Sequence, residues 1–126
     1  MKRFKEYKII KQDELEERAK FWKYTLGLDD WHIVFQVLRR DFMAEKDCSG
    51  LCQYRVVAKQ ATITLLDPID WTVLDFDQDM DKILVHELLH CKFALIDSDD
   101  SVRDVVQHRL LEELAVAIVL AYRSDR

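Results

Sequence analysis

Residues that interrupt regular structure are scarce in this chain. Its 126 residues include one proline, Pro68, and two glycines, Gly27 and Gly50. Because proline and glycine most often end helices and strands, long regular elements are expected between them, with no linker at which the chain would divide. A chain of this length can build one hydrophobic core and is too short for two. The sequence therefore predicts a single domain over residues 1–126.

Hydrophobic periodicity predicts the elements between these breaks. A helical pattern begins with the capping-box sequence of Asp13–Glu16 and ends at Gly27, a residue that suits the left-handed position after a helix. Alternating β-branched and aromatic residues indicate strands, the last two joined as a hairpin at Lys59–Gln60. The expected elements are a helix over 13–26, strands over 31–38, 51–58 and 61–66, a helix through 83–95, and a last helix through 102–122 with possible N-caps in 97–101.

This order of elements predicts the α+β class. We expect one small, mainly antiparallel three-stranded sheet with the helices packed on it. A hydrophobic fraction of 49% and a charged fraction of 34% supply a core and a polar surface, which argues against a disordered chain.

Charge and hydropathy restrict the partners. The net charge is −5 and the basic residues are scattered, so no nucleic-acid partner is expected. No apolar run approaches the ~18 residues of a membrane span, and the start of the chain lacks the apolar core of a secretion signal. These features predict a cytoplasmic protein without a membrane partner.

Cysteine use agrees with that compartment. Three cysteines are an odd number for a disulfide framework, so reduced thiols are expected. Cys48 and Cys52 flank a turn, and we interpret them as free thiols because a second pair that would complete a zinc site is missing.

The helix through residues 83–95 contains the sequence His86-Glu87-Leu-Leu-His90. Two helical residues four apart differ by ~40° of rotation and ~6 Å of rise, so both imidazoles project from one face and can reach one metal ion. Zinc accepts such ligands in a tetrahedron and, in catalytic sites, keeps one position for water. Glu87, ~100° round the helix from His86, is placed to act as the general base on that water during attack on a peptide carbonyl. The pattern arises by chance in roughly one chain per hundred of this composition.

A third protein ligand has to come from another element. Glu112 lies 22 residues after His90, enough for the chain to end one helix and return antiparallel to it. His108 shares a helix face with Glu112, so one of the two would ligate while the other supports it. Glu113 falls in an apolar stripe with Val106, where a buried acid would need a partner. Glu112 is the preferred third ligand, with His108 and Glu113 as alternatives.

The HExxH helix followed by the helix carrying Glu112 resembles a minimal zincin of the gluzincin type, and also small HExxH metallopeptidase-like proteins of phages and bacteria. This resemblance implies Zn²⁺ on His86, His90 and Glu112, Glu87 as general base, and a peptide or protein substrate lying along the strand over 61–66 as a sheet edge. The glycine and third histidine that follow the motif in metzincins are absent. The alternative is a non-catalytic binding or regulatory protein that keeps the metal site.

The last helix also contains eight uncharged residues, Ala115–Tyr122. A buried helix end or a dimer interface would explain them, and the expected state is a monomer or a weak homodimer.

Overall fold

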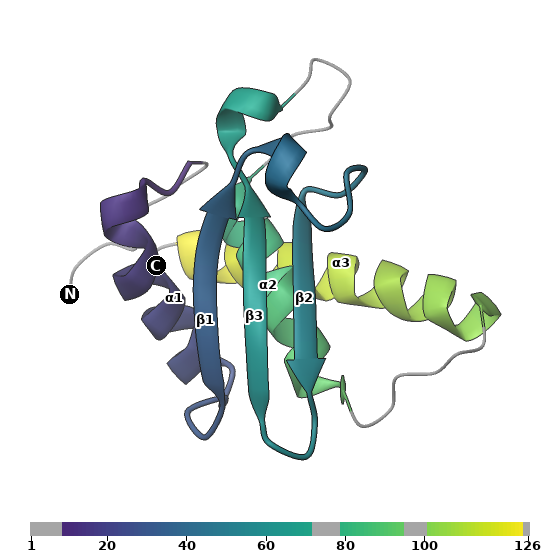
Figure 1. Ribbon diagram of the computed structural model, residues 1–126. Helices are drawn as coiled ribbons and strands as arrows, with labels where there is room; N and C mark the ends of the chain where they lie inside the picture. Colours follow the sequence, from purple (N-terminus) through teal and green to yellow (C-terminus); the bar gives the residue numbers. More distant parts are fainter. Residues whose placement is uncertain (1–8, 72–78, 95–100, 125–126) are drawn as a thin grey trace.

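The computed structural model describes residues 9–71, 79–94 and 101–124 (Figure 1). The predicted order of helix, three strands and two helices is confirmed, and with it the α+β class. Short 3₁₀ turns, η1 and η2, follow β1 and β3. The elements are α1 (Gln12–Thr25), β1 (His32–Leu38), η1 (Arg40–Phe42), β2 (Gly50–Arg55), β3 (Gln60–Leu66), η2 (Pro68–Asp70), α2 (Met80–Lys92) and α3 (Ser101–Arg123).

The sheet is mixed, so the prediction of a mainly antiparallel sheet is wrong. Its order is β1-β3-β2, with β1 parallel and β2 antiparallel to β3. The reason lies in β3, where Ala61 and residues 63–66 are all buried and thus both faces of the strand are covered. A strand buried on both faces occupies the centre of a sheet, whereas the more exposed β1 and β2 form its edges. The expectation that residues 61–66 form an edge is therefore also wrong.

The hairpin between β2 and β3 is confirmed, although its turn lies earlier than predicted. The strand β2 ends at Arg55, and the N–H of Lys59 donates to the carbonyl oxygen of Val56 over 3.1 Å. Lys59 has φ 51°, the left-handed conformation that closes the turn, so Gln60 is already the first residue of β3.

Both ends of α1 can be compared with the prediction. Gly27 has φ +70° and its N–H donates to the carbonyl oxygen of Tyr24, as expected for the residue after a helix. The prediction of a capping box at Asp13 is wrong. The helix begins after Lys11, whose side chain makes no capping hydrogen bond, and Asp13 lies in the first turn. There its charge is favourable to the positive end of the helix dipole.

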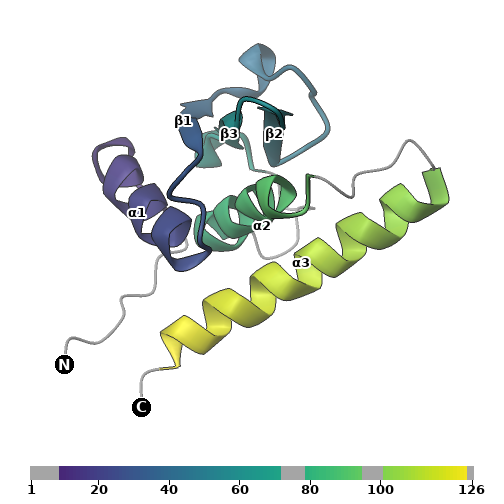
Figure 2. The same ribbon diagram turned by 90° about the horizontal axis from the view of Figure 1, so that it is seen from below.

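The helices pack behind one face of the sheet in two layers (Figures 1 and 2). The first layer is α2, which lies against the sheet with α1 beside it, and α3 runs antiparallel to α2 on the outside.

The helix α2 starts with the side chain of Asp79 accepting from the N–H groups of Asp81 and Lys82. The Asp75 and Asp77 positions expected to lead into it lie outside the described residues, as do the possible caps in 97–100. No helix in the described ranges is long and apolar enough to cross a bilayer.

A buried ionic network fixes α3 to the start of α2. Arg123 donates to Asp79 over 2.6 and 2.9 Å and to Asp81 over 3.3 Å. Asp81, which is fully buried, also accepts from Arg18 and from the indole N–H of Trp22 on α1. Because buried carboxylates need such partners, this network holds the three helices in one arrangement.

The structure defines the rotation of α3, which the sequence left open. Its buried side consists of Leu111, Ala115 and Val119. The stripe that contains Val106 and Glu113 faces outward instead, so Glu113 is not a buried acid. The helix has two apolar sides, and the packing on α2 covers only one of them.

Candidate metal centre

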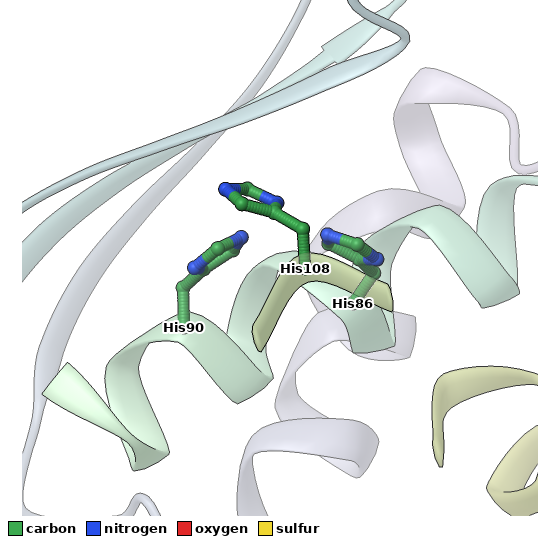
Figure 3. A group of neighbouring side chains, drawn as sticks. All are labelled: His86, His90 and His108. Carbon is green, nitrogen blue, oxygen red and sulfur yellow. The ribbon is translucent and has the colours of Figure 1, made fainter. Parts of the chain in front are cut away.

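Three imidazoles from two helices converge on one point (Figure 3). His86 and His90 project from one face of α2, as their spacing predicted, and His108 reaches over them from α3. The ring centroids are 5.1 Å apart for His86 and His90, 4.7 Å for His90 and His108, and 5.9 Å for His86 and His108. One ligand nitrogen from each ring lies within 4.8 Å of the other two.

These distances fit a metal site. Nitrogens bound to one tetrahedral zinc at ~2.0–2.1 Å lie roughly 3.3 Å from each other, so modest side-chain rotations would bring the three rings onto one ion. Three imidazoles are also the donor set of a catalytic zinc centre that leaves a fourth position for water. The described residues thus contain a three-histidine cluster able to hold a metal ion.

Glu112 lies beside this cluster and contacts one of its members. Its Oε2 is 2.6 Å from Nδ1 of His86, and 61% of its side chain is exposed, against 13% for His86. Of the two neighbouring glutamates only Glu112 contacts the cluster among the described residues. Glu113 instead forms an exposed ion pair with Arg109 at 3.5 Å. His108 and Glu112 share a helix face, as predicted. Whether Glu112 itself binds a metal stays a prediction.

The local electrostatics keep His86 available as a ligand. Burial lowers its pKa, and the positive charge that His108 can carry lowers it further, while the carboxylate of Glu112 opposes both effects. A lowered pKa favours the neutral imidazole, the form that binds metal ions.

Glu87 is the buried acid of the motif. Its side chain points towards the start of β2, where a Cβ added to Gly50 would lie 2.9 Å from Oε2. Burial raises the pKa of Glu87 to about 8, with smaller contributions from the charges of Glu112 and Cys91. The first residue of β2 thus has to be small, because the Glu87 carboxyl group occupies the space that a side chain would take.

The three cysteines are free thiols, as predicted, and two of them lie close together. Cys52 on β2 has its Sγ 3.6 Å from Sγ of Cys91 on α2, and Cys91 is adjacent to His90. The hydrogen bond with Cys52 lowers the pKa of the Cys91 thiol. Cys48 is a free thiol, and burial raises its pKa.

No protein-family description, curated protein or solved structure matches the chain. The resemblance to zincins therefore stays a prediction that depends on the residues of the motif.

Proposed function

We propose that this protein binds one Zn²⁺ on His86, His90 and His108 and hydrolyses peptide bonds with Glu87 as the general base. The observation that carries this proposal is the convergence of the three imidazoles beside a buried glutamate. Zinc held there would supply a Lewis acid that polarises a carbonyl and lowers the pKa of a coordinated water towards ~7.

His108 is preferred as the third ligand, and Glu112 takes a supporting role. In this arrangement Nδ1–H of His86 donates to the Glu112 carboxylate, which leaves Nε2 of His86 for the metal. A carboxylate that accepts from the second nitrogen of a ligand histidine fixes the tautomer and the ring orientation. Direct ligation by Glu112 is the competing arrangement.

Glu87 is a buried acid whose protonation would respond to a metal ion. With a pKa of about 8 it is mostly protonated at pH 7 in the metal-free protein, and a Zn²⁺ bound beside it would lower that pKa and favour the carboxylate that a general base needs. It lies one residue from His86 and is buried next to the start of β2.

The substrate is proposed to bind along β2 rather than β3. The strand β2 pairs with β3 on one side, and its other edge pairs with no strand of the described chain. An extended peptide could add to this edge through main-chain hydrogen bonds. Because β2 starts at Gly50, next to Glu87, such a peptide would pass close to the proposed base.

Metal content tests the first half of the proposal. Purified protein should hold about one zinc per chain, and His86→Ala or His90→Ala should lose it. His32→Ala is the matched control, since His32 lies on the exposed part of β1. A His32→Ala protein that loses zinc together with the other two variants would contradict the site.

The third ligand is tested by comparing His108→Ala with Glu112→Gln. Loss of a ligand should abolish stoichiometric binding, whereas loss of a supporting carboxylate typically weakens affinity by about 10- to 100-fold. The reverse pattern would make Glu112 the ligand and His108 the support.

Catalysis is tested with Glu87→Gln. This variant should retain zinc and lose peptide cleavage, measured by mass spectrometry on a mixture of unstructured peptides. Equal cleavage by the variant would remove Glu87 from the mechanism.

The second candidate is a non-catalytic protein that keeps the metal site. The burial of Glu87 favours it, because only 7% of that residue is exposed and a general base has to reach the metal-bound water. Zinc binding without cleavage of any peptide by the unmodified protein would support this candidate.

A further inference from the structure

The outer side of α3 is an exposed apolar stripe. Its members are spaced three or four residues apart and therefore line one side of the helix over ~21 Å. The four large side chains of the stripe are each 42–54% exposed. Large contiguous apolar surfaces on soluble proteins usually mark interaction sites. The stripe consists of Val106, Leu110, Leu114, Ala117 and Leu120.

Two charges on the outer side of α3 indicate what could cover the stripe. Arg109 borders the stripe and Glu113 lies within it, one turn further along the helix, with their side chains 82% and 64% exposed. In an antiparallel pair of α3 helices related by a two-fold axis midway between these positions, each Arg109 would face Glu113 of the other copy. In a parallel pair related by a two-fold axis along the helices, residues of the same number lie on opposite sides of the contact, so Arg109 would not face Glu113 of the other copy. The surface is thus self-complementary, as an isologous contact requires.

The other exposed face of the molecule does not complement the stripe. The solvent side of the sheet is hollowed, and the polar residues His32, Gln53, Arg55, Gln60 and Thr62 form part of its lining. Docking of the stripe on this face would bury polar groups against apolar side chains, at a cost in free energy. A head-to-tail assembly is therefore disfavoured relative to stripe against stripe.

We propose that the outer side of α3 binds a second copy of the same chain, as an antiparallel helix pair with the leucines near its centre and reciprocal Arg109–Glu113 ion pairs between the copies. This contact is independent of the proposed hydrolytic function, because it uses the side of α3 opposite the residues that pack on α2.

Sedimentation equilibrium of the full chain tests the contact. A concentration-dependent monomer–dimer equilibrium is expected, and Leu110→Gln or Leu114→Gln should weaken it at least about tenfold, equivalent to 1.4 kcal/mol. Val34→Gln is the matched control, because Val34 is 51% exposed and lies on β1. Circular dichroism verifies that each variant is folded. A wild-type chain that stays monomeric up to millimolar concentration, or equal weakening by Val34→Gln, would overturn the proposal.

Charge exchange tests the antiparallel geometry. R109E and E113R should each associate more weakly than wild type, because each brings four like charges together in the contact. An equimolar mixture of the two variants should form heterodimers, since every pair then has opposite charges, and native mass spectrometry can separate them by mass. Homodimers of the single variants that are as abundant as heterodimers would overturn the antiparallel arrangement.

Discussion

Replacing Gly50 by alanine is expected to separate metal binding from stability and catalysis. A Cβ at this position would lie 2.6 Å from Cγ2 of Ile83 and 2.9 Å from Oε2 of Glu87. Ordinary contact begins at 3.4 Å, so the Ile83 methyl group has to retreat by about 0.8 Å. That methyl group is fixed to the backbone of α2 through a branched carbon, so β2 and α2 must move apart. Overpacking of this kind costs about 1–3 kcal/mol.

Urea unfolding with a chelator present measures this cost without a contribution from metal. The midpoint for Gly50→Ala should fall by about 1 M, taking an m-value of roughly 2 kcal/mol per M. Zinc stoichiometry should persist, because no histidine changes, while peptide cleavage should fall as the Glu87 carboxyl group is displaced. Ser49→Ala is the control. The double variant Gly50→Ala/Ile83→Ala should be less destabilised than the sum of the single variants. Additive effects, or a Gly50→Ala protein as stable as wild type, would refute the packing of β2 on α2.

Three further predictions concern the helix network, a surface acid and the metal. Asp81→Ala leaves two partly buried arginines and the buried Trp22 indole N–H without this acceptor, and should lower the free energy of unfolding by about 3–5 kcal/mol in urea titrations. A loss below about 1 kcal/mol would contradict a structural role. The hydrogen bonds from Arg39 lower the pKa of Asp70 to about 2, so the stabilisation from this pair is present above pH 3.8 and is lost as the pH falls towards 2. Carboxyl ¹³C NMR should report that midpoint, and a value near 3.8 would rule out the pairing. Zinc at 100 times its Kd should stabilise the wild-type protein by about 2.7 kcal/mol in thermal unfolding and leave His90→Ala unchanged; an equal gain in both proteins would place the ion elsewhere.

The element order was predictable because each element carries its own periodicity. The order of the strands in the sheet was not predictable, because it depends on which strand is buried on both of its faces. The hairpin made β2 and β3 neighbours, but only the burial of Thr64 and Leu66 as well as Ile63 and Leu65 places β3 in the centre. The hydrophobic pattern of a strand shows which of its own faces is apolar. Whether the strand lies at the edge or the centre depends on the other strands of the sheet.

The same limit applies to the candidate site. His86 and His90 share one helix, so their convergence follows from the spacing alone. Which residue of α3 joins His86 and His90 depends on the rotation of that helix. Because α3 has apolar residues on two sides, its sequence did not show which side faces α2. The inward side is set by contacts that the sequence does not encode locally, including the Arg123 pairs with Asp79 and Asp81. These contacts turn α3 so that His108 and Glu112 both lie next to His86 and His90.

The central position of β3 also imposes an order on folding. The hairpin pairs Arg55 with Gln60, whereas the parallel pairing joins His32 to Gln60, 28 residues away. The longer loop costs about 1.5 kcal/mol more in closure entropy, by the logarithmic dependence on loop length. The hairpin should therefore nucleate first and β1 should dock on it later, so that amide hydrogens in β1 exchange before those of β3 in the native protein.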